Sequence, residues 1–354
     1  MEIMPMSNQR KKILFLSLSG IGNYVMQSPA IAATRQQWPD AKISVWVAPR
    51  GTAVLAEADP NVDEVIEMPI KASVFQHTAA AWRLALRKFD IGIVLSPGQH
   101  FKSAAYLWLA GIPVRVGAKY RLGGRQRSGF WLTHSLDEDT DLHDIEQNLR
   151  LLSLLGVSTA RYAGEPYQIV LPEAALRDAD VVVDKMKIPT ESKLFGFHMG
   201  SSEAMKYKRW PVDNFIELGR QLSSEDRGAV LLFGGRNEME LKSKVKVAFG
   251  ERAHIVDEDL LCSAAVASKC ELFISNDSGL MHIAAAVGTK TLGLFGPTDE
   301  KLTGPRGVDS HALRAEGTKP VFDTDLSFEL GARAHESLEQ LKIESVIDFI
   351  EAIV

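Results

Sequence analysis

Short apolar runs alternate along the first half of the chain with stretches in which apolar residues recur every three or four positions. The run at 13–18 is almost continuously apolar and precedes a glycine turn. Such runs are typical of strands buried on both faces, as in a parallel sheet. The pattern predicts further strands at 43–48, 62–67, 91–95 and 114–117, and helices at 27–38, 79–88, 104–109 and 143–155. This alternation predicts right-handed crossovers and a parallel sheet with helices on both faces.

A second alternating series follows a stretch that contains Pro166 and Pro172 and has weak periodicity. It predicts strands at 194–198, 229–233, 254–256, 272–275 and 291–295, and helices at 212–222, 238–249, 260–268, 280–287 and 343–353. We interpret 156–177 as a linker, because domain boundaries favour exposed segments rich in proline, glycine and polar residues. The sequence therefore predicts two Rossmann-like α/β domains, residues 1–170 and 171–354. Their ligand is expected at the carboxyl ends of the strands, in a cleft between the domains.

Charge and composition narrow the classes of function. Forty basic and 45 acidic residues give a net charge of −5, which argues against nucleic acid as a partner. Cys262 and Cys270 are too few for a disulfide framework or a zinc site, and we interpret both as core residues in a reducing cytoplasm. No apolar run approaches the ~20 residues of a membrane-spanning helix. We expect a cytoplasmic protein, and composition leaves open a peripheral contact with the inner face of the membrane.

The most informative motif follows the predicted strand at 272–275. It reads Asn276-Asp277-Ser278-Gly279 and leads directly into a predicted helix. We expect Asn276 or Asp277 to cap this helix through a side-chain oxygen. The first N–H groups of the helix and the positive end of its dipole would suit a pyrophosphate. The alternative is a well-capped helix without a ligand.

A second motif follows the predicted strand at 194–198. Ser201 and Ser202 precede a basic cluster that includes Lys208, just before a helix begun by Pro211. Serine hydroxyls and a lysine ammonium can hold phosphate oxygens. A positive group there would also stabilise the charge that develops on a departing nucleotide diphosphate. The alternative is a solvated basic turn.

The glycine turn after the first strand, Ser19-Gly20-Ile21-Gly22, is only partly similar to a dinucleotide fingerprint. Val25 stands at the third glycine position, so an NAD site and an oxidoreductase are weakly supported.

Together these segments resemble glycosyltransferase family nine, the ADP-heptose:lipopolysaccharide heptosyltransferases. The resemblance rests on the motifs at 20–22, 143–156, 208–211, 234–235, 276–282 and 293–298. It implies a GT-B fold with two Rossmann-like domains facing a cleft, and no requirement for a metal or cofactor. It also implies inverting transfer of a heptose or related sugar from an ADP-sugar donor, as substrate, to a glycan or glycolipid acceptor such as the lipopolysaccharide core.

The same resemblance implies roles for individual residues. Lys208 would balance the charge of the diphosphate, and Asp277 would meet the donor sugar. Glu238 loosely matches an acidic residue that holds the ribose, since a carboxylate can accept two hydroxyl donors. The donor-binding residues would be Gly22, Ser201, Ser202, Glu238, Ser278, Gly279, Leu280 and His282.

One position departs from the family pattern. Family members usually carry an aspartate, thought to be the general base, where this chain has Asn23. An amide cannot accept a proton at neutral pH. Three explanations stay open: another group such as His77 or His100 substitutes, the acceptor hydroxyl is activated differently, or catalysis is impaired. Asn23 therefore suggests one rival function, a catalytically impaired sugar-nucleotide binder. The second rival is a sugar-nucleotide epimerase, because such enzymes can share this two-domain architecture.

The sequence says less about the acceptor. Five positive charges lie within thirteen residues, at Arg115, Lys119, Arg121, Arg125 and Arg127. Such a segment would suit a phosphorylated or carboxylated glycolipid, although a solvated charged loop would have the same composition.

Overall fold

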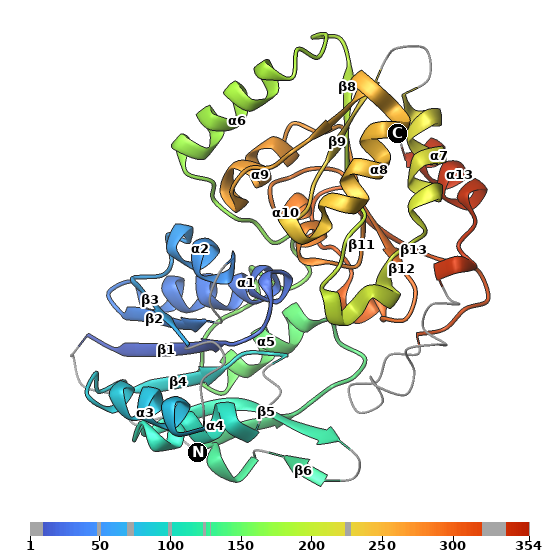
Figure 1. The fold of residues 1–354 in the computed structure, drawn as a ribbon. Coiled ribbons are helices and arrows are strands. Elements are labelled where there is room, and N and C mark those ends of the chain that lie inside the picture. Colours follow the sequence, from blue (N-terminus) through green and yellow to red (C-terminus); the bar gives the residue numbers. More distant parts are fainter. Residues whose placement is uncertain are drawn as a thin grey trace. The chain divides into compact units, whose positions relative to one another are not determined.

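The computed structural model describes residues 10–47, 51–68, 74–97, 101–122, 125–127, 129–223, 228–320 and 338–353. The chain divides into two compact units, Met1–Val170 and Leu171–Val354. Each unit is built around its own sheet (Figure 1).

Parallel pairing dominates the sheet of the N-terminal unit. Its described strands are β1 (Lys12–Ser17), β2 (Lys42–Val47), β3 (Glu64–Glu67), β4 (Ile91–Val94), β5 (Val114–Leu122), β6 (Arg125–Arg127) and β7 (His134–Asp137). The order is β3-β2-β1-β4-β5, with β7 parallel to β5 and β6 antiparallel to the end of β5. Strand order reverses between β1 and β4, where a doubly wound sheet opens a crevice for ligands.

The helices of this unit cover both faces of the sheet. They are α1 (Ile21–Gln37), α2 (Gly51–Ala58), α3 (Val74–Ala85), α4 (Phe101–Leu109) and α5 (Asp144–Ser153), with a 3-10 turn η1 (Gly129–Trp131). In Figure 1, α1 and α2 lie on one face of the sheet, and α3 and α4 on the other.

Helix α1 begins six residues earlier than the sequence pattern predicted, immediately after Gly20. We had expected the residues before Gln27 to form a turn, but Gly22 already lies in the first helical turn. Pro29 is inside the helix and cannot donate to the carbonyl of Val25. The hydroxyl of Ser28 donates to that carbonyl instead, at 2.8 Å, so the helix continues through the proline.

The sheet of the C-terminal unit repeats the same strand order. Its described strands are β8 (Lys193–His198), β9 (Gly228–Leu232), β10 (Ala253–Ile255), β11 (Leu272–Asn276), β12 (Thr291–Phe295) and β13 (Ser310–Arg314). They are parallel in the order β10-β9-β8-β11-β12-β13, so the switch point lies between β8 and β11. Together the two sheets confirm the predicted pair of Rossmann-like folds.

The helices of this unit include two that the sequence pattern did not predict, at 173–185 and 300–303. They are α6 (Glu173–Lys185), α7 (Val212–Leu222), α8 (Met239–Phe249), α9 (Leu260–Ala267), α10 (Gly279–Ala286), α11 (Glu300–Thr303) and α13 (Ile343–Ile353), with 3-10 turns η2 (Glu203–Lys208), η4 (Arg236–Glu238) and η5 (Gly250–Arg252). Helix α6 begins inside the stretch that we had interpreted as linker. Its buried residues are Ala175 and Ala179, one turn apart, and such small side chains give only a weak hydrophobic pattern.

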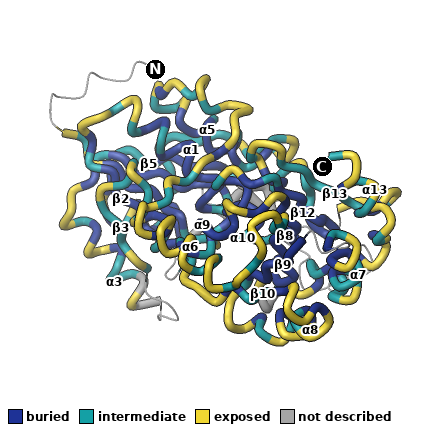
Figure 2. Tube along the Cα trace, turned by 90° about the horizontal axis from the view of Figure 1, so that it is seen from above, coloured by how far each residue is buried: buried dark blue, intermediate teal, exposed yellow. Residues whose placement is uncertain are grey.

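Apolar side chains pack on both faces of the C-terminal sheet. One core contains Phe197, Phe215 and Trp210, and the other contains Phe233 and Phe273. Strand β9 is buried along its whole length, whereas α8 carries exposed turns (Figure 2).

Both cysteines are buried free thiols in the C-terminal unit, as predicted. Burial, with a further contribution from nearby acidic side chains, raises the pKa of Cys262 to about 11. Burial alone raises the pKa of Cys270 well above the ordinary range of a thiol.

Candidate active site

The two motifs that the sequence singled out in the C-terminal half meet at the switch point of its sheet. His198 ends β8 and Asn276 ends β11, and the pairing register places Ser275 opposite His198. The loops that follow these two strands therefore leave the same edge of the sheet side by side. Residues that are almost eighty positions apart in the sequence therefore lie in one site.

Lys208 and Asp277 form an ion pair within this site. The Lys208 Nζ lies 2.6 Å from Asp277 Oδ2, and both side chains are largely buried. Thr298, which follows β12, donates its hydroxyl to the same carboxylate oxygen at 2.6 Å. Burial by itself would raise the pKa of Asp277, but the charge and hydrogen bond of Lys208, with contributions from Thr298 and His282, lower it below its usual value. The pair is therefore an ammonium and a carboxylate anion.

Asn276 holds the loop after β8 against the end of β11. Its Nδ2 donates to the carbonyl of Met199 at 2.7 Å, and its Oδ1 accepts from the backbone N–H of Trp210 at 2.9 Å. The indole of Trp210 in turn donates to the carbonyl of Leu341 at 2.8 Å. This clamp fixes both ends of the segment that carries Lys208.

The expectation that Asn276 or Asp277 caps helix α10 was wrong. Ser278 is the N-cap, and its hydroxyl accepts from the N–H of Met281 at 3.4 Å. Asn276 still belongs to β11 and binds the β8 loop, while Asp277 binds Lys208 and Thr298. The amide of Asn276 and the carboxylate of Asp277 therefore bind other parts of the unit, and the hydroxyl of Ser278 caps the helix.

The first turn of α10 keeps the geometry of an anion site. Ser278, Gly279 and Leu280 are half-buried at its start, and the first N–H groups of a helix have no acceptor within the helix. Ser278 Oγ also lies 2.8 Å from His198 Nδ1, which joins the cap to β8. His282 is buried one turn further along α10. His198 ends the predicted strand from which the second motif begins, and no role in the site was predicted for it.

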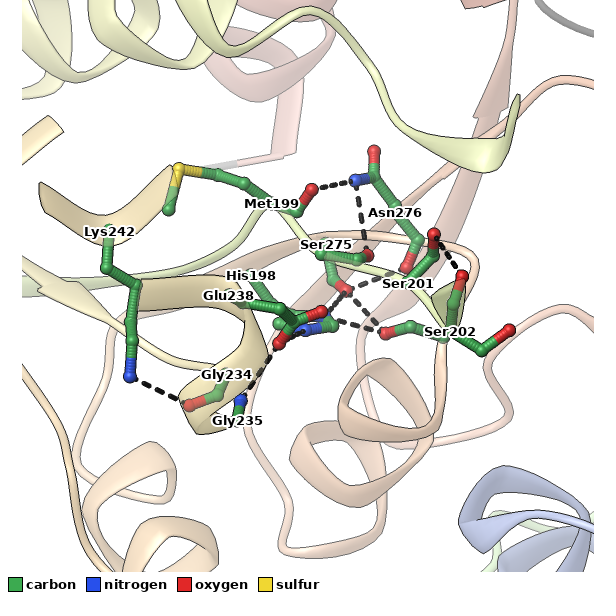
Figure 3. Close-up of polar contacts among 12 residues, drawn as sticks. His198, Met199, Ser201, Ser202, Gly234, Gly235, Glu238, Lys242, Ser275 and Asn276 are labelled. Atoms are coloured by element: carbon green, nitrogen blue, oxygen red, sulfur yellow. Dashed lines mark hydrogen bonds and ion pairs between the residues drawn. The ribbon is translucent and has the colours of Figure 1, made fainter. Parts of the chain in front are cut away.

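Glu238 is buried in the 3-10 turn η4, which follows the neighbouring strand β9 (Figure 3). Its Oε2 accepts from the N–H of Gly235 at 2.9 Å and lies 3.3 Å from His198 Nε2. Burial would raise the pKa of Glu238, but the hydrogen bond and charge of His198, the Gly235 N–H and the charge of Arg209 lower it overall. The side chain is an anion that ties the β9 loop to β8.

Two glycines are required around Glu238. A Cβ on Gly200 would lie 1.6 Å from Glu238 Oε1, so no larger residue fits there without displacing the carboxylate. Gly234 has a φ of +134°, in the region that glycine favours, and a Cβ there would lie 2.4 Å from Glu238 Oε2. Lys242 is fully buried beneath this turn and donates to the carbonyl of Gly234 at 2.9 Å.

The two serines of the second motif differ in their surroundings. Ser201 is buried, donates to the carbonyl of Met205 at 2.8 Å and accepts from Arg209 Nε at 3.1 Å. Ser202 is exposed. Arg209 also donates to the carbonyl of Ser201 at 2.8 Å, so it braces the loop that carries both hydroxyls.

A separate polar network lies at the switch point of the N-terminal sheet. Asn23 is partly buried in the first turns of α1, and Gln27 follows one turn later. Gln27 Nε2 donates to the carbonyl of Ser96, after β4, at 2.8 Å. The N–H of Ser96 donates to Asn148 Oδ1 at 2.6 Å. The loop after β4 is thus held between α1 and α5.

Asp144, in the first turn of α5, belongs to this network and was missed by the sequence analysis. Ser96 Oγ donates to its Oδ1 at 3.3 Å. Burial raises the pKa of Asp144 to about 7; the nearby charge of Glu138 adds to the rise, and the Ser96 hydrogen bond opposes it. A carboxyl group that exchanges its proton near neutral pH is suited to acid–base chemistry.

The structure describes only some of the basic residues proposed for the acceptor and of the histidines proposed as a base. Arg115 donates to the carbonyls of Trp131 and Ile112, each at 2.6 Å, and so braces β5 against its neighbours. Lys119 is partly buried on β5. Several expectations lie outside the described residues: His100 entirely, and the side chains of His77, Arg121, Arg125 and Arg127.

Comparison with known proteins places this site in a family. Lipopolysaccharide heptosyltransferase 2 of Escherichia coli is 26% identical over 97% of this chain and 98% of its own length. Lipooligosaccharide heptosyltransferase 2 of Campylobacter jejuni is 32% identical over 80% of this chain and 81% of its own. The structure of an Escherichia coli heptosyltransferase with ADP has a TM-score of 0.72 at 21% identity, over 97% of this chain and all of that one. The family described as glycosyltransferase family 9 (heptosyltransferase) matches residues 78–329, and the chain therefore belongs to that family.

Proposed function

We propose that this glycosyltransferase moves a heptose from ADP-heptose to the core of a lipopolysaccharide or lipooligosaccharide. The observation that carries the proposal is the buried Lys208–Asp277 pair beside the first turn of α10. Two relatives are named for heptose transfer to these glycolipids, and one neighbour was solved with ADP. Family membership favours transfer over the rival epimerase and over a binder without activity.

The donor would lie along the carboxyl edge of the C-terminal sheet. The N–H groups of Ser278, Gly279 and Leu280 would bind the pyrophosphate, as the positive end of a helix favours an anion. The Lys208 ammonium, held in place by Asp277, would stabilise the negative charge that grows on the leaving diphosphate. Asp277 keeps this ammonium in a fixed position, which limits the reorganisation needed in the transition state.

The nucleoside would extend toward β9. Because Glu238 Oε2 is already bound to Gly235 and His198, we propose that Oε1 accepts from the ribose hydroxyls. Gly200 lets the carboxylate lie against the β8 loop, so the ribose and phosphate subsites share one rigid support.

The acceptor hydroxyl needs a proton acceptor other than Asn23. We propose Asp144, which lies at the switch point of the N-terminal sheet and receives a hydrogen bond from Ser96. A base acts when it is deprotonated, and a pKa of about 7 leaves a substantial fraction in that form at neutral pH. The rate of transfer should therefore rise with pH and level off above about pH 7 in the wild type.

A pair of variants separates position 23 from position 144. Asp144→Asn should lower transfer by roughly a hundredfold, the effect expected for removal of a general base. The exposed Asp141→Asn should have no such effect. Asn23→Asp should leave transfer equal or higher if position 23 faces the acceptor. Full activity in Asp144→Asn would remove Asp144 from the mechanism.

The first experiment is a calorimetric titration of the full chain with ADP, UDP and GDP. Selective ADP binding that weakens in Lys208→Ala and Asp277→Ala, but not in the exposed Lys193→Ala, would support the donor site. A preference for UDP would assign another donor class. Binding of none of the three would overturn the proposal.

Transfer to lipopolysaccharide would require the enzyme to meet an acceptor anchored in a bilayer. No helix among the described residues is long and apolar enough to cross a membrane. We propose that the enzyme works peripherally at the cytoplasmic face of the membrane.

A further inference from the structure

Positive charge is concentrated in one segment of the N-terminal unit. Residues 68–136 contain ten lysines and arginines and a single acidic residue, Asp90, which gives this segment a charge of +9 in a chain of net charge −5. Asp90 Oδ2 is itself occupied by the N–H of Lys12, at 2.7 Å. The remainder of the chain is strongly acidic by difference, so the protein carries its charge asymmetrically.

The same segment carries the exposed aromatic side chains. Among the described residues, the large aromatic residues left open to solvent are Trp82, Trp108 and Phe130, exposed by 68%, 49% and 70%. Leu86, one turn after Trp82, is 77% exposed. Exposed large apolar side chains elsewhere in the described chain are aliphatic and carry no ring. Such clusters commonly mark a surface that meets a partner or a membrane.

These side chains lie on one side of the N-terminal sheet. Helices α3 and α4 share a core that includes Leu84 of α3 and Leu107 of α4, so both helices cover the same face of the sheet (Figure 1). Trp82 and Leu86 are exposed where Leu84 is buried, and Trp108 is exposed where Leu107 is buried. Their side chains therefore emerge from the outer side of this helical layer.

Ring contacts extend this surface to η1. The rings of Trp108 and Trp131 have centroids 4.5 Å apart, and those of Trp131 and Phe130 are also 4.5 Å apart. Exposed basic residues lie close to these rings in the sequence, in or just after α3 and in α4: Arg83, Lys88 and Lys102, with Arg87, which also pairs with Glu64. We call the outer side of α3, α4 and η1, with these residues, the basic aromatic surface.

We infer that the basic aromatic surface docks on an anionic lipid bilayer. Tryptophan and phenylalanine side chains are favoured at the boundary between headgroups and acyl chains. Lysine and arginine beside them are attracted to the negative surface potential of the membrane. The aliphatic side chain of Leu86 cannot stack on the bases of a nucleic acid, but it can insert among acyl chains. The inference rests on the proposed function in one respect, because a glycolipid acceptor would be presented by such a bilayer.

The test is sedimentation of the full chain with lipid vesicles. One set contains phosphatidylcholine alone, and the other contains equal parts of phosphatidylcholine and phosphatidylglycerol. We expect binding to the anionic set, weakened at about 0.5 M salt because the surface potential is screened. Equal binding to both sets, or binding to neither, would overturn the inference.

Two groups of variants test the residues separately. Trp82→Ser with Phe130→Ser should weaken binding to anionic vesicles by about tenfold or more, as expected when inserted rings are lost. Each of Arg83→Gln and Lys102→Gln should weaken it about fivefold. Val247→Ser, at an 84% exposed position of α8 in the other unit, is the matched control and should bind as the wild type does.

Docking and transfer can fail independently. The ring variants should bind ADP normally and should transfer normally to a deacylated, soluble acceptor, while losing activity on acceptor embedded in vesicles. Vesicle binding without ADP binding would refute the proposed function and leave the docking surface standing. Two results together would assign the surface to nucleic acid and refute docking on a bilayer. A short DNA duplex would displace the wild type from anionic vesicles, and the ring variants would bind those vesicles as tightly as the wild type does.

Discussion

Replacing Lys208 by methionine should destabilise the C-terminal unit through Asp277. Methionine keeps much of the length of the lysine side chain and removes its charge. Asp277 would then remain buried with Thr298 as a hydrogen-bond donor but without the ammonium at 2.6 Å. Breaking a buried ion pair in this way typically costs about 3–5 kcal/mol. The retained Thr298 bond places the expected loss near the lower end, at about 3 kcal/mol.

The cost should depend on pH in a definite direction. In the wild type the pKa of Asp277 is lowered on folding, so its contribution to stability is present above the unfolded pKa and is lost as pH falls through the folded pKa. Without Lys208, burial becomes the dominant influence and raises the pKa of Asp277. The variant is then penalised most at neutral pH, and the difference from wild type should shrink as the pH falls toward about 4.

Urea titration combined with hydrogen exchange measures this loss in the right unit. Peptides covering β11 (Leu272–Asn276) report the opening of the C-terminal sheet separately from the rest of the chain. The matched control is Lys193→Met, because Lys193 pairs with Glu271 at 3.1 Å and both side chains are about half exposed. That change should cost no more than about 1 kcal/mol.

Two results would refute this reasoning. One is a loss for Lys208→Met that is no larger than the loss for Lys193→Met. The other is a loss that stays constant from about pH 8 to about pH 5, since an uncompensated carboxylate must respond to protonation. The double variant Lys208→Met with Asp277→Asn should recover much of the lost stability, because it leaves no unpaired buried charge.

Three further predictions follow from the geometry. Gly200→Ala should reduce ADP affinity at least tenfold in calorimetry, because the new Cβ would displace Glu238; unchanged affinity would exclude Glu238 from the nucleotide site. The pKa of Asp144 is raised on folding, so the free energy of unfolding of the wild type should fall as pH rises from about 4 through about 7. Asp144→Asn should remove up to roughly 4 kcal/mol of that pH dependence in urea titrations. Cys270 should resist a disulfide reagent in native protein at about pH 8 and react only on unfolding, and rapid native labelling would contradict its burial.

The fold class and most of the strands could be predicted from sequence because parallel strands buried on both faces leave continuous apolar runs. Strands β7 and β13 were missed because their residues are only partly buried. Runs such as 291–295 were placed to the residue. Helix α6 was missed for the converse physical reason, since the residues that it buries fully are two alanines, and Val182 and Val183 are only partly buried. The early start of α1 was missed because the compensating hydrogen bond from Ser28 to Val25 cannot be read from residue types.

The site was predictable only where its residues are local in sequence. Lys208 and Asp277 could be proposed separately from their motifs, but their direct pairing depends on the register between β8 and β11. Thr298 was predicted only as part of a motif, and its bond to Asp277 depends on the pairing of β11 with β12. The contact of His198 with Ser278 depends on the pairing of β8 with β11. Asp144 has an ordinary position in a predicted helix, and only its burial beside Ser96 distinguishes it.

The two sheets share one strand order yet carry different chemistry at their switch points. In the C-terminal unit, charged residues are paired around a helix start, as at Lys208 and Asp277, which suits a ligand with several negative charges. In the N-terminal unit, the hydroxyl of Ser96 donates to the carboxyl of Asp144, and amides from Gln27 and Asn148 hold Ser96 in place. The charge of Glu138 lies nearby. This network of amides, a hydroxyl and carboxyl groups would bind a diphosphate poorly, and burial allows the carboxyl of Asp144 to hold its proton near neutral pH. The difference in chemistry, rather than in fold, is therefore the physical reason for proposing that the donor binds to the C-terminal unit and that proton transfer takes place in the N-terminal one.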